Sequence, residues 1–225
     1  MLHLLLDFDG TLSDSSEGVI DCVRYALKQC GVLCNETTET LSHIFVGPPL
    51  SESFPEYIGR KDEPLTERFV DYFHERYIAC GVNMTSMYPG CEEFLAKCSG
   101  KFGISTASSK PIEFVEKLLR EYGIYKYFDS VFATSLADEM RTKRETIEKA
   151  MHSIKQVDND AEFIMIGDRK YDVNGASEAG IECIGVRWGF ALPGELEAAG
   201  AIAVADDFDA LYSLVCEYAA RKAIR

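Results

Sequence analysis

The apolar residues of this chain show two different kinds of spacing. Residues 2–6 form a short apolar run that stops at Asp7, a pattern typical of a strand buried on both faces. From about residue 16 to residue 85 the apolar positions recur at helical spacing, interrupted where Gly47-Pro48-Pro49 must break any helix. This stretch is therefore predicted to consist of helices.

From Tyr88 onward, short apolar runs alternate with helical patterns. Strands are predicted over residues 101–107, 130–134, 163–166, 183–186 and 202–205, and helices over 111–122, 144–154, 172–179 and 208–220. This alternation predicts a parallel sheet with helices on both faces, which the first strand rejoins. We expect an α/β fold: a Rossmann-like doubly wound parallel sheet core, formed by residues 1–15 and 86–225, with an inserted all-helical cap over residues 16–85.

Charge and composition restrict the partners. The 225 residues carry a formal net charge of −14, which argues against non-specific binding to a nucleic acid polymer or to an anionic membrane. The apolar start is too short for a signal-peptide core, and no run approaches the ~18 apolar residues of a membrane span. We expect a cytoplasmic protein, either a monomer or a homodimer.

Cysteine and histidine give no sign of a metal centre. The eight cysteines are scattered without a C-x-x-C pair, and the four histidines show no zinc spacing. Cys22, Cys30 and Cys98 occupy apolar positions of helical patterns. The cysteines are therefore predicted to be reduced core thiols.

Polar residues gather where the predicted strands end, the edge at which doubly wound sheets bind ligands. They are Asp7, Asp9, Ser108, Ser109, Asp168 and Asp172, with Lys143 in the loop before a helix. In an extended segment, Asp7 and Asp9 would lie on one side, roughly 6 to 7 Å apart. Converging carboxylates are costly without a cation, and Mg²⁺ is the cation that prefers such oxygen ligands.

Four ordered motifs carry a family resemblance. Asp7-Phe8-Asp9-Gly10-Thr11 matches the D-x-D-G-T signature of the haloacid dehalogenase-like superfamily. The segments around Ser108 (residues 106–111), around Lys143 (residues 141–145) and over residues 167–172 resemble its second, third and fourth motifs. The resemblance covers nearly the whole chain, including a helical cap inserted after the first motif.

The resemblance implies a catalytic role for each motif. Asp7 would attack phosphorus and form an aspartyl-phosphate, while Asp9 would protonate the leaving oxygen and later deprotonate water. Lys143 would neutralise charge on Asp7 and on the phosphoryl group. Asp7, the backbone carbonyl of Asp9 and Asp168 would hold Mg²⁺. Asp172 would bind the metal through water or orient Lys143.

The same motifs imply phosphate contacts. Gly10 would let the backbone turn sharply and Thr11 would support that loop. Ser108 would donate a hydrogen bond to a phosphoryl oxygen, as would Lys143. The amides of Ser109 and Lys110 are expected in the first turn of a helix, aimed at the same anion.

Lys143 has two competitors for its role. Arg141 and Arg144 lie in the same predicted loop, and the local pattern T-K-x-x-x-I favours Lys143. Arg169 and Lys170 are expected on the solvent side.

The resemblance implies a Mg²⁺-dependent phosphatase acting on a small phosphorylated metabolite. Gly47-Pro48-Pro49-Leu50 and the fourth motif resemble a bacterial subgroup near phosphoglycolate phosphatases, whose members are often called 5′-nucleotidase-like. A phosphomutase of the same fold is the main alternative. A dehalogenase would not need Asp9, and a non-catalytic binding protein would often lack Asp7 or Asp9.

The cap leaves the substrate open. The loop containing Pro48 and Pro49 either presents a rigid edge to the active site or simply connects two helices. Arg60 and Lys61 are candidates for contacting a second anionic group. Four aromatic residues would either stack on a base or form the core of the cap: Phe45, Phe54, Tyr57 and Tyr72.

Overall fold

The structure is a computed structural model that describes residues 1–135 and 142–223. Its contacts divide the chain into two compact units. The core unit comprises Met1–Leu12 with Met87–Arg225, and the helical unit comprises Ser13–Ser86. Arg141, one competitor for the role of Lys143, lies outside the described residues.

The core unit is built from strands and helices that alternate along the chain. Its strands are β1 (Leu2–Leu6), β4 (Gly103–Thr106), β5 (Ser108–Pro111), β6 (Ala133–Thr134), β7 (Glu162–Gly167), β8 (Glu182–Val186) and β9 (Ala203–Ala205). Its helices are α5 (Cys91–Cys98), α6 (Ile112–Glu121), the 3₁₀ helix η2 (Tyr125–Tyr127), α7 (Lys143–Lys155), α8 (Lys170–Glu178), α9 (Glu195–Ala199) and α10 (Phe208–Ala223).

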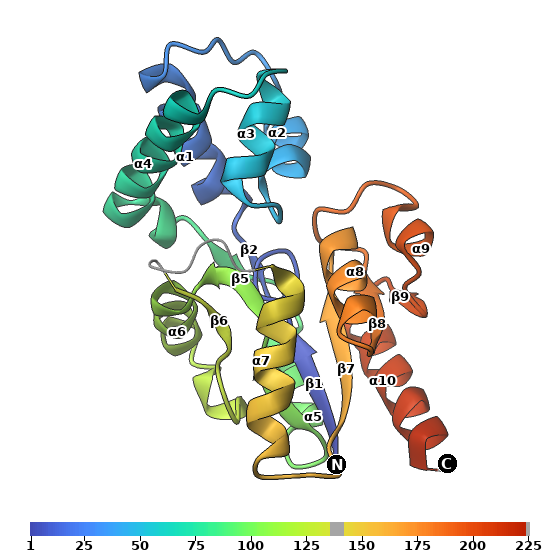
Figure 1. Cartoon of the computed structure of the whole chain (residues 1–225). Helices are drawn as coiled ribbons and strands as arrows, with labels where there is room; N and C mark the ends of the chain where they lie inside the picture. The colour runs from blue at the N-terminus through green and yellow to red at the C-terminus, as the bar shows by residue number, and fades with distance from the viewer. Residues whose placement is uncertain (136–141, 224–225) are drawn as a thin grey trace. The chain divides into compact units, whose positions relative to one another are not determined.

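Five of these strands form one parallel sheet in the order β4-β1-β7-β8-β9 (Figure 1). β1 therefore lies inside the sheet, where Leu6 pairs with Thr106 of β4 on one side and with Ile166 of β7 on the other. Every residue of β1 is buried, as its uninterrupted apolar run predicts. Beside this sheet, β5 and β6 make a separate parallel pair.

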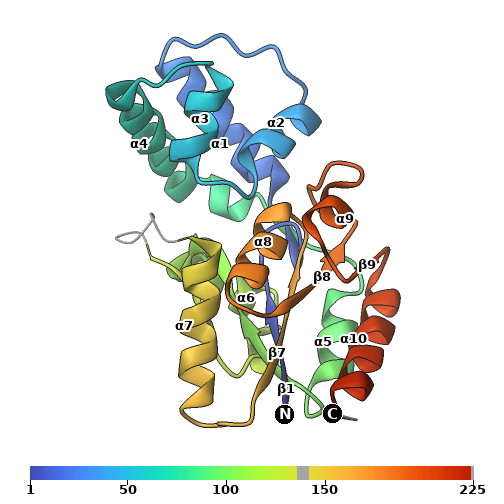
Figure 2. The ribbon, with the colours of Figure 1, turned by 45° about the vertical axis from the view of Figure 1, so that its right-hand side comes forward.

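Helices cover both faces of the sheet. α7 and α8 pack on one face, where Leu5, Phe163 and Met165 meet Ile147 of α7 and Val173 of α8 in one buried cluster. Figure 2 shows α5 and α10 on the opposite face. Because side chains alternate across a strand, the remaining apolar residues of β1 and β7 point to that face. This arrangement confirms the predicted doubly wound α/β fold.

The helical unit contains four α-helices. They are α1 (Ser16–Gln29), α2 (Thr38–Phe45), α3 (Leu50–Tyr57) and α4 (Glu63–Ala79), with the 3₁₀ helix η1 (Gly81–Asn83) and the strand β2 (Ser13–Asp14). β2 pairs with β3 (Ser86–Met87). The core of this unit is aromatic: Phe69 stacks on Phe54 with ring centroids 4.1 Å apart, and Phe45 packs 5.8 Å from Phe69.

Several local predictions differ from the structure. The strand predicted over 130–134 shortens to Ala133–Thr134, because its partner β5 pairs irregularly. α5 and α9 were not predicted. Lys143 is the first residue of α7 instead of a loop residue, because Thr142 and Glu145 form a capping box that starts the helix there.

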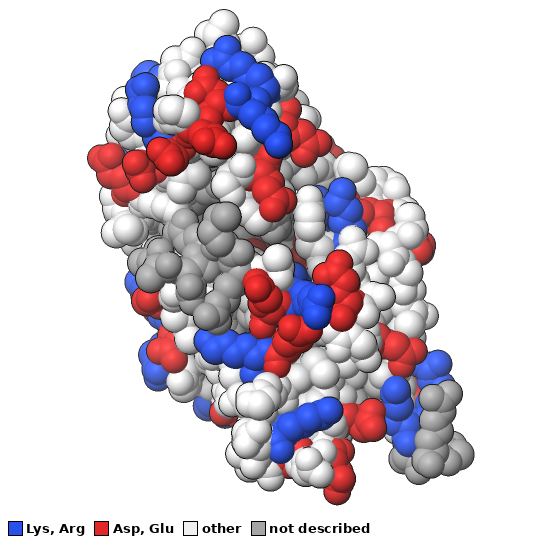
Figure 3. Space-filling model, in the orientation of Figure 1, with Lys and Arg blue, Asp and Glu red and all other residues white. Residues whose placement is uncertain are grey.

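All eight cysteines are free thiols, but only four of them are buried as core thiols should be: Cys22, Cys91, Cys98 and Cys183. The other four, Cys30 among them, are partly exposed, so the core prediction is wrong for these. Among the described residues, no helix is both long and apolar enough to cross a membrane. On the face drawn in Figure 3, acidic side chains are interspersed with basic ones, so the described residues present no continuous basic surface there.

Candidate active site

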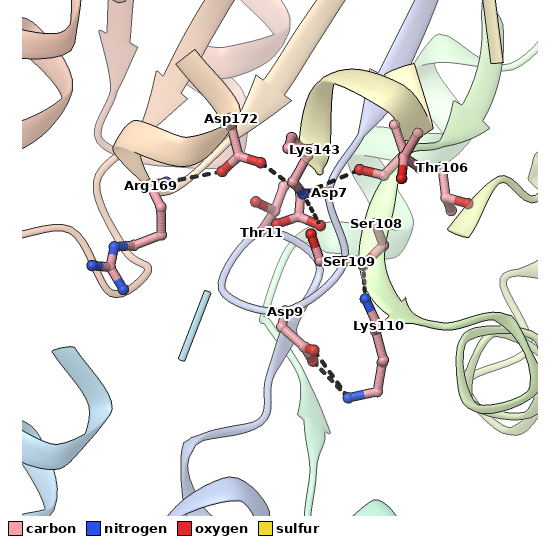
Figure 4. Close-up of polar contacts among 12 residues, drawn as sticks. Asp7, Asp9, Thr11, Thr106, Ser108, Ser109, Lys110, Lys143, Arg169 and Asp172 are labelled. Atoms are coloured by element: carbon pink, nitrogen blue, oxygen red, sulfur yellow. Dashed lines mark hydrogen bonds and ion pairs between the residues drawn. The ribbon is translucent and has the colours of Figure 1, made fainter. Parts of the chain in front are cut away.

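The ends of β1 and β7 and the starts of α7 and α8 bring four charged side chains together, of which Figure 4 labels Asp7, Asp172 and Lys143. Asp7 directly follows β1, and its amide donates to the Ile166 carbonyl oxygen at 2.9 Å. Asp168 directly follows β7, beside Asp7. Asp172 lies in the first turn of α8, and Lys143 opens α7. All four residues are buried.

Lys143 joins two of these carboxylates. Its Nζ lies 2.9 Å from Asp7 Oδ1 and 2.8 Å from Asp172 Oδ1, and it donates to the Ala107 carbonyl oxygen at 3.2 Å. A cation at a helix N-terminus is disfavoured by the helix dipole, so these carboxylates must compensate. Burial alone would lower the pKa of Lys143, but Asp172 and Asp7 outweigh it and raise that pKa above its usual value. The ammonium group therefore stays charged.

Gly175 of α8 allows this close approach of α7. A Cβ atom at position 175 would lie 2.9 Å from Lys143 Cγ and 3.1 Å from the Arg144 backbone nitrogen. Both distances are shorter than ordinary van der Waals contacts. The glycine therefore places the start of α7 against α8, a role that the sequence did not reveal. Arg144 itself pairs with Glu148 on the exposed side of α7, away from Lys143's partners.

Asp168 sits in a cradle of backbone and glycine. Its Oδ2 accepts a hydrogen bond from the Phe190 amide at 2.8 Å, and its Oδ1 accepts from Thr11 Oγ1 at 3.4 Å. A Cβ atom on Gly10 or Gly189 would collide with this carboxyl group. Gly10 also has a φ of +78°, so it makes the sharp turn that was predicted. Burial, reinforced by Asp172 and Asp7, raises the pKa of Asp168 well above its usual range.

The donor set fits a hard divalent cation. Asp7, Asp168 and Asp172 each offer a carboxylate oxygen, and these oxygens lie within 4.8 Å of one another. A raised pKa at Asp168 marks a carboxylate whose charged form requires a nearby cation. Asp172 is already engaged by Lys143 and by the Arg169 amide at 3.0 Å, so its remaining capacity for a metal is smaller. The Asp9 carboxylate is not a member of this group.

The Asp9 carboxylate lies outside this carboxylate group and contacts a different lysine, Lys110. Both of its carboxylate oxygens lie 3.0 Å from Lys110 Nζ. The extended geometry expected for residues 7–9 is wrong, because the chain turns at Phe8, whose carbonyl oxygen accepts from the amides of Thr11 and Leu12. No local pattern predicts the Asp9–Lys110 contact, because the two residues lie 101 positions apart.

Ser108 and Ser109 have different surroundings. Ser108 is 1% exposed, at the start of β5, and its Oγ accepts from the Lys110 amide at 3.2 Å. Ser109 is exposed, and its carbonyl oxygen accepts from Thr134 Oγ1 at 2.8 Å. The expected helical turn here is wrong: Ser108–Pro111 is a strand and α6 begins at Ile112. The Lys110 amide is therefore occupied by Ser108.

Arg169 is buried, contrary to the expectation that it faces solvent. Its Nε donates to Glu195 Oε1 at 2.9 Å, and both side chains are less than 10% exposed. Glu195 also accepts from the amides of Lys170 and Leu192. This pair ties α8 to the loop that carries Phe190, whose amide holds Asp168. Lys170 is exposed, as expected.

Comparison with known proteins places this site in a family. Residues 4–186 match the sequence profile of the haloacid dehalogenase-like hydrolases. A 5′-nucleotidase from Pseudomonas aeruginosa is 33% identical over 198 residues, which cover 87% of each chain. A phosphoglycolate phosphatase from Vibrio parahaemolyticus is 25% identical over 94% of this chain and 95% of that protein. A crystal structure of a predicted phosphatase from Clostridium acetobutylicum superposes with a TM-score of 0.87 at 35% identity, covering 96% and 98% of the two chains.

The chain therefore belongs to the haloacid dehalogenase-like hydrolases. This family is the one that the resemblance of the four motifs implied, and the relatives named above include a 5′-nucleotidase and a phosphoglycolate phosphatase. The Rossmann-like α/β core agrees with that of the solved structure.

Proposed function

We propose that this protein is a Mg²⁺-dependent phosphatase that hydrolyses a small phosphate monoester through an aspartyl-phosphate on Asp7. The observation that carries the proposal is the contact of Asp7 Oδ1 with Lys143 Nζ, at 2.9 Å, inside a group of three buried carboxylates. A carboxylate beside a fixed cation at the end of a buried strand is suited to attack an anionic phosphoryl group.

In the first half of the reaction, Asp7 attacks phosphorus and the ester P–O bond breaks. The proton of the Asp9 carboxyl group goes to the leaving oxygen, so that an alcohol departs. Lys143 neutralises charge as it moves from Asp7 to the phosphoryl oxygens. Ser108 donates its hydroxyl hydrogen to one of these oxygens, while Gly10, Thr11 and Ser109 line the phosphate position.

In the second half, water attacks the phosphorus of the aspartyl-phosphate. Asp9, now a carboxylate, takes the proton of that water, and the P–O bond to Asp7 breaks. Inorganic phosphate and the free Asp7 carboxylate result. Asp9 loses a proton in the first half of the reaction and regains one from water in the second half, so no external proton donor is required.

Mg²⁺ would be held by the carboxylates of Asp7 and Asp168 and by the backbone carbonyl of Asp9. When bound, it would supply positive charge against the phosphoryl oxygens and offset the mutual repulsion of the carboxylates. Asp172, which touches Lys143 at 2.8 Å, orients that lysine.

Several candidate substrate contacts in the cap, residues 16–85, are already engaged within the helical unit. Phe45 and Phe54 are buried in the aromatic core of the helical unit, so neither is available to stack on a base. Tyr57 donates to Glu36 Oε2 at 2.6 Å, and Arg60 pairs with Asp62. The burial of Phe45 and Phe54 favours the core as the place of these two rings. The relatives point to phosphoglycolate and nucleoside monophosphates as the first candidates.

Phosphate release tests the proposal. Purified protein with Mg²⁺ is expected to liberate phosphate from p-nitrophenyl phosphate, and EDTA is expected to stop the reaction. Asp7→Asn should lose all activity, whereas Asp209→Asn, an exposed partner of Lys97, serves as the matched control. Full activity of Asp7→Asn would show that another group is the nucleophile.

A substrate screen identifies the physiological class. Phosphoglycolate, nucleoside monophosphates and sugar phosphates are compared by kcat/KM for phosphate release. A sugar 1-phosphate that gives its isomer without free phosphate would instead assign the phosphomutase activity.

A further inference from the structure

We propose that Lys110 is a positioning residue for Asp9: it holds the proton-transferring carboxyl group apart from the metal-binding carboxylates and stabilises the charge left after proton donation. This inference rests on the proposed function, because it assigns a second lysine to the same reaction. It concerns a contact that the four sequence motifs do not explain.

Lys110 contacts the whole carboxyl group of Asp9. Lys110 Nζ lies 3.0 Å from Asp9 Oδ1 and 3.0 Å from Asp9 Oδ2, so both oxygens of the carboxyl group are engaged. The side chain of Lys110 is 4% exposed and that of Asp9 is 21% exposed. Separating the two side chains would leave a buried ammonium group without a partner, which is energetically costly. The burial of Lys110 therefore favours the paired arrangement.

The stem of Lys110 is fixed at both ends. Its amide donates to Ser108 Oγ at 3.2 Å, so it belongs to the strand β5 that also presents the proposed phosphate-binding serine. Its Nζ lies 5.9 Å from the centroid of the Phe8 ring, which stacks on Tyr122. A lysine held in this way fixes the direction of Asp9 relative to Ser108.

The two aspartates of the first motif are thereby separated. Asp7 contacts Lys143 and belongs to the carboxylate group with Asp168 and Asp172. Asp9 contacts Lys110 and lies outside that group, as Figure 4 shows. Without Lys110, the Asp9 carboxylate would be free to turn toward the metal as an additional ligand. With it, Asp9 stays available for proton transfer.

The chemical consequence concerns the leaving group. When Asp9 gives its proton to the leaving oxygen, negative charge develops on its carboxylate, 3.0 Å from the Lys110 ammonium. This stabilisation matters when the leaving oxygen is basic and must be protonated, as in an alkyl phosphate. It matters little for p-nitrophenolate, which departs without a proton.

Lys110→Met tests the inference by comparing two substrates. For an alkyl phosphate such as glycerol 3-phosphate, kcat/KM is expected to fall about 10- to 100-fold, a part of the ~10²–10⁴-fold that a general acid contributes. For p-nitrophenyl phosphate the loss should stay within about threefold, because no proton is needed. Lys110→Arg keeps a cation at this position and should restore much of the alkyl-to-aryl ratio.

Two further variants make the comparison decisive. In an Asp9→Asn background, Lys110→Met should change the ratio no further, because the two residues act as one unit. Lys117→Met removes an exposed lysine that pairs with Glu121 and is expected to leave both substrates unaffected. Lys110→Gln repeats the test with a shorter polar side chain if the methionine variant proves poorly folded by circular dichroism.

Three results would overturn the inference. Equal losses for both substrates would indicate a structural role, and a rise in KM alone would indicate that Lys110 binds substrate directly. An undiminished effect in the Asp9→Asn background would break the link to Asp9. If the wild-type protein releases phosphate from neither substrate, the proposed function itself is refuted, and the inference with it.

Discussion

Replacing Lys143 by methionine tests the electrostatic design of the site in the metal-free protein. The change removes the cation that lies 2.9 Å from Asp7 and 2.8 Å from Asp172, while an unbranched side chain still fills the space. Breaking a buried ion pair by removing one partner costs about 3–5 kcal/mol, because it leaves uncompensated charge. For a chain of this length, each kcal/mol corresponds to about 2–4 °C in Tm, so a decrease of ~6–20 °C is expected.

The decrease in Tm should depend on whether protons or Mg²⁺ neutralise the carboxylates in place of Lys143. Burial raises the pKa of Asp172 to about 6 despite the opposing effect of Lys143, so acid protonates it readily. Without Lys143, protonation should occur at still higher pH. The Tm difference between variant and wild type should therefore be largest near pH 8 and shrink toward pH 5, and Mg²⁺ should reduce it at pH 8.

Thermal unfolding in EDTA, followed by circular dichroism, measures these differences. The double variant Lys143→Met/Asp172→Asn is the internal control, because removing both partners should cost less than removing the lysine alone. A Tm loss that is independent of pH, or a double variant less stable than Lys143→Met, would refute the electrostatic explanation and point to packing of the lysine stem.

Three other measurements follow from the same structure. In EDTA, the stability that protonated Asp172 contributes should be lost as pH rises from ~4 to ~7, because burial raises its pKa to about 6 from ~3.9 in the unfolded chain. Urea unfolding of the wild type and of Asp172→Asn at several pH values checks this, and the same pH dependence in both proteins would contradict it. Gly10→Ala should lower Mg²⁺ affinity about tenfold or more by calorimetric titration, because its Cβ would collide with Asp168 and its φ of +78° is strained for alanine; unchanged affinity would show that the loop shifts freely. Phe69→Ala should destabilise the helical unit by about 3–5 kcal/mol, since the ring is fully buried against Phe54; a change below 1 kcal/mol would mean that the aromatic core collapses without cost.

The sequence predicted those parts of the molecule that depend on local pattern. The apolar runs of β1 and β7 fixed where Asp7 and Asp168 stand, and the parallel arrangement then required both to lie at one edge of the sheet. Lys143 contacts Asp7 at 2.9 Å, its catalytic role stays a prediction, and its helix starts one residue earlier than expected. These contacts follow from topology as soon as the strands are known.

What the sequence did not predict depends on side chains meeting across long separations. For Lys110 the sequence predicts only a backbone amide aimed at phosphate, because the contact with Asp9 requires the turn at Phe8 and the short strand β5. From the sequence Arg169 is expected in solvent, because its partner Glu195 opens α9, a short helix that the apolar pattern does not predict. In both cases a buried charged side chain is paired with a residue far away in the sequence, and the spacing of apolar residues does not predict such pairs.

The interior place of β1 has a consequence for how the protein forms during synthesis. Its residue His3 pairs with Phe163 of β7, about 160 residues later. At typical elongation rates of about 5–20 residues per second, the first strand waits roughly 8–30 s for that neighbour to be made. Throughout that interval the edge of β1 that faces β7 is unpaired, which makes the nascent chain prone to misassociation and a natural client of chaperones. The strand that ends at the proposed nucleophile is thus the first to be synthesised and among the last to be enclosed.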